Sequence, residues 1–442
     1  MKIRWKQWPV LLAAPFFPLF FIPLTGGGLN SLELNFVAAL LLGVAALTNS
    51  KLLLNSPFFI YGVIIPWSII LIGYLVPSIF LGPRTSFLPF IAQIVFLVAA
   101  SGLAVSLEAW LRTGSKNLFI FTSLVIISYF IGLYIHSNPV NFWGIWNSIL
   151  NLEVWNLIVH ARRAFNPDAF IGETIAVDRL ANNHNRIAQQ TFSLGYFVLT
   201  LSLLSRARLS ELSFSLFVSF SALTIILSLL LMSGQSMGQF LISVVFCSAA
   251  SLIFKPTQTK LMLAACTVVL FAVLMTFLAN TDFGQAWATR LSSGNIDTGR
   301  VVRWVFYWQN GASWTVIGEP NSLSIDPHNM LVTLFFETGV VGTLGFLLFC
   351  VFLISSSVTR LRTGYVRFGF AYLMAISTGL QTIFVMMIAG GYGFPGWAEM
   401  SKFSLFLLVL FLHQTSPKEV TRPVSVTQGR PSSPGRVEEK LG

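Results

Sequence analysis

Two short polar segments in an otherwise apolar chain carry the residue types that could do chemistry. The first begins with Arg300 and Arg303, and the second holds Asp326, His328 and Asn329. Arginine guanidinium groups grip phosphate oxygens as a bidentate fork and stay charged at any working pH, so this pair suits a pyrophosphate. A neutral His328 can take a proton from a sugar hydroxyl near pH 7. Asp326 and Asn329 are close enough in sequence to orient its ring.

A second polar cluster precedes the apolar run that starts near residue 187. It contains Arg179, His184 and Arg186 together with three asparagines. Glu337 is about two helical turns beyond His328, and an ionisable group inside an apolar run is costly and tends to be functional. We expect Arg179, His184, Arg186 and Glu337 to contribute to substrate binding, and Glu337 could pair with a loop arginine. Whether Arg179 or Arg186 would be the second pyrophosphate ligand stays open.

Each of these residues also has a plain structural interpretation. A histidine that follows proline at the start of a span is often an interfacial or capping residue. Arg300 and Arg303 would share one face of a helix and could form a stripe toward solvent or lipid headgroups. The cluster before residue 187 could be an ordinary capped start of a helix. The spacing alone leaves these alternatives open.

The composition tells which elements must position these residues. The chain has 442 residues, of which 55% are hydrophobic and only 10% charged. Soluble domains carry roughly 25% charged residues, so most side chains here are expected in lipid. The net charge of +11 has its default explanation in cationic cytoplasmic loops, and we do not expect a nucleic-acid partner.

The apolar residues fall into about twelve runs of the length that a membrane-spanning helix needs, roughly 20 residues. The sequence therefore predicts an all-α, polytopic membrane protein with about twelve transmembrane helices and two long outer loops, near 137–186 and 279–329. The runs cover residues 8–24, 29–47, 58–81, 87–111, 118–135, 187–204, 214–232, 237–254, 261–278, 330–354, 368–389 and 397–412.

The cations orient these spans. Counted against spans of alternating direction, 18 of the 27 Lys and Arg residues lie on the side of the two termini. The positive-inside rule therefore predicts cytoplasmic termini, with the polar segments on the outer side of the membrane. Seven cations lie in the two long outer loops, and all are arginines: Arg162, Arg163, Arg179, Arg186, Arg290, Arg300 and Arg303. They could serve function or simply pair with the acids of the same loops.

Four further segments or residue sets have expected structures. The run 8–24 lacks an Ala-x-Ala-like cleavage site and is interpreted as a retained signal anchor. Residues 141–165 hold three tryptophans and are predicted to form a helix in the outer interface. Residues 1–413 form one transmembrane domain, and 414–442 are predicted to be a disordered cytoplasmic tail. The three cysteines lie in apolar runs and are interpreted as small core side chains.

Several classes of function lack their signatures. The sequence has no glycine-rich loop with a lysine for nucleotide phosphates, no HExxH, no GxSxG and no paired cysteines. Its loop acids are not closely spaced as Mg²⁺ or Ca²⁺ ligands are, so we expect neither a metal nor another cofactor. A secondary transporter of an anionic substrate is a less favoured alternative, because such proteins are expected to show internal repeats and none is found.

The order of these residues resembles the O-antigen ligase and O-antigen polymerase superfamily. The resemblance rests on a Gly-Arg followed by a Trp, a loop glycine, Asp-Pro-His-Asn, an apolar run and Glu-x-Gly. These positions are Gly299, Arg300, Trp304, Gly318, Asp326, Pro327, His328, Asn329, Glu337 and Gly339. The motif covers about fifty residues, and the expected span number and orientation extend the similarity over most of the chain.

The resemblance implies a metal-independent glycosyltransferase with a glycan donor carried on undecaprenyl pyrophosphate. Arg300 and an arginine before the sixth span, taken as Arg179, would hold the pyrophosphate, and His328 would activate the acceptor hydroxyl. An O-antigen ligase would pass the glycan to lipid A core or another outer acceptor. The alternative is an O-antigen or exopolysaccharide polymerase, which would pass it to another lipid-linked unit.

Overall fold

The computed structural model describes most of the apolar chain. It covers residues 7–19, 34–82, 86–113, 116–137, 139–151, 153, 156, 160, 184–230, 234–254, 300–310, 318, 329–388 and 397–414. Within these ranges every regular element is a helix and there is no strand. The elements are α1 (Trp8–Ala13), α2 (Asn35–Thr48), α3 (Ser50–Leu54), α4 (Pro57–Phe59), the π-helical turn η2 (Ile60–Ile64), α5 (Ile65–Leu81), α6 (Phe87–Thr113), α7 (Lys116–His136), α8 (Pro139–Leu150), α10 (His184–Leu204), the 3₁₀ turn η3 (Arg206–Arg208), α11 (Glu211–Leu230), α12 (Gly234–Phe254), α15 (Arg300–Asn310), α16 (Met330–Thr359), α17 (Leu361–Phe368), α18 (Phe370–Ile388) and α19 (Trp397–Gln414).

The described helices form an apolar bundle of the kind that crosses a membrane. Eight helical stretches in this part of the chain are long and apolar enough to span a bilayer, and two shorter apolar helices, Asn35–Thr48 and Lys402–His413, accompany them. Helices occupy eleven of the twelve predicted runs, at least in part. The run 261–278 lies outside the described residues, as do the proposed anchor beyond residue 19 and the tail beyond residue 414.

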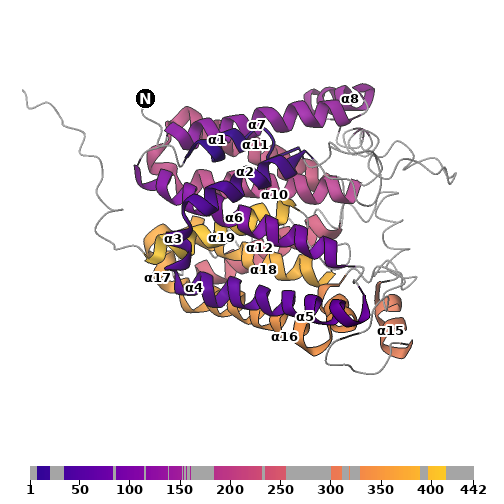
Figure 1. The fold of residues 1–442 in the computed structure, drawn as a ribbon. Coiled ribbons are helices and arrows are strands. Elements are labelled where there is room, and N and C mark those ends of the chain that lie inside the picture. Colours follow the sequence, from indigo (N-terminus) through magenta and orange to yellow (C-terminus); the bar gives the residue numbers. More distant parts are fainter. Residues whose placement is uncertain are drawn as a thin grey trace, which may run out of the picture.

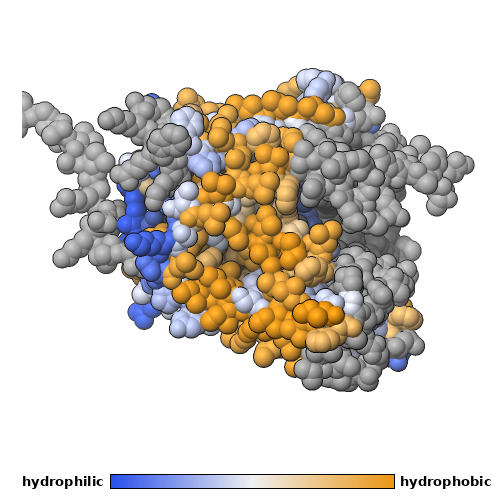
Figure 2. All heavy atoms as spheres, in the orientation of Figure 1, coloured by the Kyte–Doolittle hydropathy of each residue, from blue (hydrophilic) through white to orange (hydrophobic). Residues whose placement is uncertain are grey.

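The two ends of the bundle differ in character. The long helices lie side by side, with α15 at one end and α3 and α17 at the other (Figure 1). Hydrophilic residues gather at the end that carries α3 and α17, and apolar side chains cover the band between the two ends (Figure 2). We call these the basic end, which holds Arg112, Arg208 and Arg367, and the α15 end.

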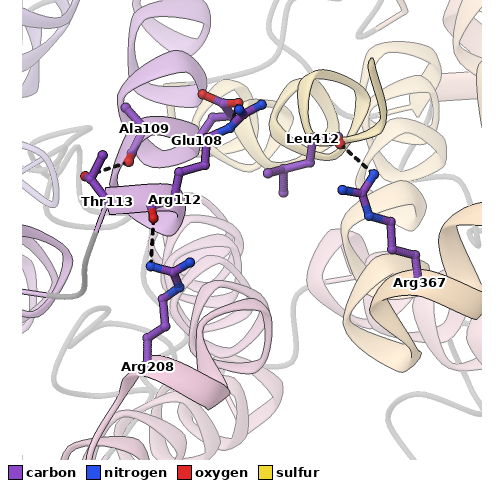
Figure 3. Close-up of polar contacts among 7 residues, drawn as sticks. All are labelled: Glu108, Ala109, Arg112, Thr113, Arg208, Arg367 and Leu412. Carbon is purple, nitrogen blue, oxygen red and sulfur yellow. Dashed lines mark hydrogen bonds and ion pairs between the residues drawn. The ribbon is translucent and has the colours of Figure 1, made fainter. Parts of the chain in front are cut away.

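Arginines at the basic end bind the carbonyl ends of the helices that finish there (Figure 3). Arg208 Nη1 donates to the carbonyl of Arg112 in the last turn of α6 at 3.0 Å, and Arg367 Nη1 donates to that of Leu412 in α19 at 3.2 Å. The last carbonyls of a helix have no partner within the helix and carry a partial negative charge. The cations that the sequence assigns to orientation therefore also cap helices.

Glu108 forms an ion pair with Arg112 at the basic end. Its carboxylate pairs with Arg112 one turn further along α6, at 2.5 Å. Glu108 is thus a charge-paired acid near the end of α6.

Glycines allow α5 and α16 to approach closely. A Cβ on Gly345 would lie 2.6 Å from the carbonyl oxygen of Pro66, and one on Gly73 would lie 2.9 Å from the backbone nitrogen of Gly342. Gly339 behaves differently, because its φ of 67° and ψ of −151° interrupt α16 with a kink. Its freedom from a side chain serves the backbone conformation.

Two other sequence expectations can be compared with the fold. Cys247 is buried, Cys350 is half-buried, and both are free thiols within apolar helices, while Cys266 lies outside the described residues. The predicted interfacial segment 141–165 is helical where α8 covers it, and the ring of Phe142 packs on Tyr134 of α7 at 5.4 Å between centroids. Its position relative to a membrane interface stays a prediction.

Candidate active site

The helix that starts at Arg300 is held against the first turns of α16. Tyr307 in α15 is almost completely buried, and its ring lies 5.5 Å from that of Phe336. Trp308 lies 5.0 Å from Phe335 and 5.7 Å from Phe336, between ring centroids. Aromatic pairs of this kind contribute about 0.5–1.5 kcal/mol beyond the area they bury. These ring contacts hold α15 against the first turns of α16.

The two predicted arginines occupy the first turn of this anchored helix. Arg300 is its first residue and Arg303 follows one turn later. Positions 300, 303 and 307 lie along one side of a helix by their spacing, and Tyr307 is the residue on that side that meets α16. The backbone therefore brings both arginine positions to the same end of the molecule as the start of α16.

Asn329 caps α16 directly after the Asp-Pro-His segment. Its backbone is extended, with φ −151° and ψ 116°, and its side-chain oxygen accepts the Val332 N–H at 3.1 Å. Such caps satisfy one of the unpaired donors at a helix start. Asn329 is only 4% exposed. The cap fixes where the chain leaves residue 328 and enters the bundle, whereas a contact of Asn329 with substrate stays a prediction.

The buried carboxylate of Glu337 stands at the N-terminus of another helix. Its Oε2 accepts hydrogen bonds from the backbone N–H of Ser86, at 3.0 Å, and from the Ser86 hydroxyl. Ser86 is the residue before α6, and its carbonyl accepts the first hydrogen bond of that helix, from Phe90. Tyr74 of α5 lies 2.5 Å from the Ser86 hydroxyl, between the two oxygens. A negative charge is favourable at a helix N-terminus. Through these hydrogen bonds Glu337 joins α16 to α6 and, by way of Ser86, to α5.

Gly318 brings the preceding loop against the same turn of α16. Its φ is 66°, and a Cβ there would lie 2.5 Å from the carbonyl carbon of Glu337. Only glycine fits this position, because it tolerates both the positive φ and the close approach of two backbones. The described positions of the motif thus lie together near the start of α16: Arg300, Trp304, Gly318, Asn329, Glu337 and Gly339.

The remaining predicted site residues are described only in part. His184 and Arg186 begin α10, so the second polar cluster does end in a helix start, while their side chains, like those of Arg300 and Arg303, lie outside what is described. Arg179, Asp326 and His328 lie outside the described residues altogether. In the described part of the chain no group of three or more His, Cys, Asp or Glu residues could hold a metal ion.

Sequence reasoning missed the partners that hold this end together. Nothing in the spacing marks Ser86 or Tyr74, because their contacts with Glu337 and with each other join separate helices. A second polar group, around Lys402 of α19, was also missed as a site. The signal for it was present, since Lys402 is a cation inside an apolar run, but its partners lie on other helices and could not be identified.

Comparison with known proteins adds no identification. No protein-family model matches the chain, and no curated protein matches it either.

Proposed function

We propose that this protein is a membrane glycosyltransferase that moves a glycan from undecaprenyl pyrophosphate to an acceptor, in the manner of an O-antigen ligase. The packing of α15 onto α16 carries the proposal, because it joins the helix of Arg300 to the turn that follows His328. The buried Glu337 and the close contact of Gly318 with the same turn support it. These positions are among those on which the resemblance rests.

In this mechanism the protein supplies charge and a base. Arg300 and Arg179 hold the pyrophosphate, and their charge stabilises the phosphate oxygens as the sugar bond breaks, which is where preorganised cations are most effective. Arg303, Arg186 and His184 extend this binding region. His328 takes the proton of the acceptor hydroxyl as it attacks. Asp326 and Asn329 orient His328, and no metal takes part.

The proposal includes an orientation and a span number. We infer about twelve spans in the bacterial inner membrane, both termini in the cytoplasm and the α15 end facing the periplasm. The arginine-capped helix ends at the basic end support this orientation, because short loops rich in Lys and Arg stay in the cytoplasm. The tail beyond residue 414 is expected on the same side.

The central test replaces the two catalytic candidates. We expect Arg300→Ala and His328→Ala each to lower glycan transfer by about 100-fold or more, because each removes a group that acts in the transition state. Transfer is measured in proteoliposomes that contain a lipid-linked donor and an acceptor. Arg206→Ala is the matched control, since Arg206 is half-exposed at the basic end and pairs with Glu211. Full activity of either site variant contradicts the mechanism.

The acceptor separates the ligase from the polymerase. Both break the same bond between sugar and pyrophosphate, so the residues above serve either reaction. The glycans of a deletion strain distinguish them: unattached long chains indicate a ligase, and chains of a single unit indicate a polymerase. Chains of a single unit would mean that the acceptor is another lipid-linked unit, and the proposed site residues would stay the same.

A further inference from the structure

A lysine is buried within the bundle on the side of the α15 end. Lys402 lies in the second turn of α19 and is only 1% exposed. Its ammonium group donates to the side-chain oxygens of Gln239 in α12 and of Gln381 in α18, the latter at 2.7 Å. A cation inside a membrane-spanning bundle is costly and tends to mark a functional site.

Four helices surround this ammonium group. Gln381 donates in turn to the Ser243 hydroxyl of α12 at 2.5 Å, and the ring of Phe192 in α10 lies 5.4 Å from Lys402 Nζ. Gln239 and Lys402 each lie in the second turn of their helix, so α12 and α19 begin at the same end, and α10 begins there too because it finishes beside Arg208 at the basic end. Phe192 is eight residues from the first residue of α10, which corresponds to about 12 Å along the helix. The positive ends of three helix dipoles therefore lie on the same side as the ammonium group.

Two further hydrogen-bond donors on α12, the helix whose Gln239 contacts Lys402, have no partner among the described residues. The side-chain nitrogen of Gln239 and the hydroxyl of Ser236 are fully buried, and neither has a hydrogen-bond partner among the described residues. Positions 236 and 239 share one face of α12. Buried polar groups are nearly always hydrogen-bonded, so each unsatisfied one needs an explanation. An ammonium group, an amide N–H and a hydroxyl together match an oxyanion.

We propose that Lys402, Gln239 and Ser236 form a binding site for the phosphate group of a membrane lipid. The inference builds on the proposed function, in which the lipid is undecaprenyl pyrophosphate and Lys402 adds a positive charge to those of the loop arginines. The same chemistry fits the headgroup of an anionic phospholipid. The phosphate oxygens accept from the Lys402 ammonium group, the Gln239 amide and the Ser236 hydroxyl.

The test compares lipids that differ in the phosphate. The purified full-length protein is titrated with undecaprenyl pyrophosphate, with undecaprenol, which has the same tail and no phosphate, and with dioleoylphosphatidylglycerol. Binding is measured by native mass spectrometry and by the shift of the thermal unfolding midpoint. Lys402→Gln keeps donors for the two amide oxygens and removes the charge, whereas Lys402→Arg keeps the charge. Lys116→Gln, an exposed lysine in the first turn of α7, is the matched control.

We expect wild type, Lys402→Arg and Lys116→Gln to bind undecaprenyl pyrophosphate more tightly than undecaprenol. Lys402→Gln should bind it on the order of 10- to 100-fold more weakly, because a charge-assisted hydrogen bond is lost. Equal binding by Lys402→Gln and wild type, or equal binding of the two polyprenyl lipids, overturns the proposal. If phosphatidylglycerol binds as tightly as the pyrophosphate and with the same dependence on Lys402, the phosphate site stands and its ligand is a phospholipid.

Ser236→Ala keeps the proposal testable if Lys402→Gln does not fold. Because the Ser236 hydroxyl bonds to nothing in the described structure, its removal should leave the unfolding midpoint unchanged while weakening pyrophosphate binding several-fold. Unchanged binding by Ser236→Ala also counts against the site. Loss of transfer in Arg300→Ala together with unaltered lipid binding in Lys402→Gln would reject this inference and keep the proposed function. Full transfer in Arg300→Ala together with weakened lipid binding in Lys402→Gln would reject the proposed mechanism and keep the lipid phosphate site.

Discussion

The contact between Glu337 and Ser86 gives one buried carboxylate a structural task that can be separated from chemistry. Glu337→Ala leaves the Ser86 N–H, at the start of α6, without its acceptor. A buried donor without a partner costs about 1–3 kcal/mol, so we expect a lower thermal unfolding midpoint. Glu337→Gln keeps an acceptor oxygen and should cost less. Intrinsic tryptophan fluorescence of the solubilised protein measures both midpoints.

The glycan-transfer assay on the same pair separates two roles. If Glu337→Gln unfolds like wild type and transfers normally, the carboxylate acts through the position of α6. If it unfolds like wild type and is inactive, its charge takes part in transfer. An unfolding midpoint of Glu337→Ala equal to that of wild type contradicts the structural role.

At this scale the sequence identifies candidates better than contacts. Residue type and spacing single out Arg300, His328 and Glu337, because each is polar at the edge of an apolar run or inside it. The partner of Glu337 is 251 residues away, and serines are too common to signal a contact across that separation. Lys402 is visible as a cation in an apolar run, but its two glutamines are ordinary residues of other helices.

Among the elements, the turn that contains Gly318 is the most constrained by its backbone. Gly318→Ala places a Cβ 2.5 Å from the Glu337 carbonyl carbon, at a φ of 66°. Gly369→Ala is the matched control, because Gly369 has a φ of 64° and open space around it. The control should lose about 1–3 kcal/mol, because its φ of 64° and ψ of −147° belong to a region that residues other than glycine rarely adopt. We expect Gly318→Ala to lose more stability and most of its transfer activity.

The measurement compares unfolding midpoints and transfer rates of the two alanine variants. Equal loss of stability in both would mean that the loop moves away from α16 without cost. In that case the contact at Gly318 would not hold the loop, and it would no longer support the proposed site.

The helices themselves were largely predictable, and their irregularities were not. Apolar length locates the described spans to within a few residues, because a helix that crosses lipid must satisfy its backbone internally. The kink at Gly339 was missed, since a glycine in an apolar run fits close packing equally well. The packing of α15 on α16 depends on aromatic rings that meet only in the folded structure. The spacing in the sequence therefore showed that Arg300 and His328 are near each other along the chain, but it did not show how α15 packs.

For the whole molecule, the positions of α12 and α15 show that the chain is at opposite ends of the bundle at Phe254 and at Arg300. The last residue of α12, Phe254, packs on Tyr365 of α17, just past the end of α16. Tyr307 of α15 packs near the start of α16. Phe336, the residue of α16 that Tyr307 contacts, lies 23 residues before the end of α16 at Thr359, so about 35 Å of helix separates these two contacts. We therefore expect the chain to cross the bilayer between Phe254 and Arg300, and we predict that the run 261–278 provides this span.

Chemical labelling tests the proposed orientation, in which the α15 end faces the periplasm and the basic end faces the cytoplasm. In a background with Cys247, Cys266 and Cys350 replaced by alanine, one cysteine is introduced at Val302, which is 69% exposed on α15, or at Lys116 at the basic end. If the α15 end faces the periplasm, a membrane-impermeant maleimide labels Val302→Cys in intact spheroplasts and Lys116→Cys only after lysis. The reversed pattern would put the arginine-capped helix ends outside, against the positive-inside rule. It would also leave Arg300 in the cytoplasm, where a periplasmic acceptor cannot reach it, so this measurement bears on the proposed reaction as well as on the topology.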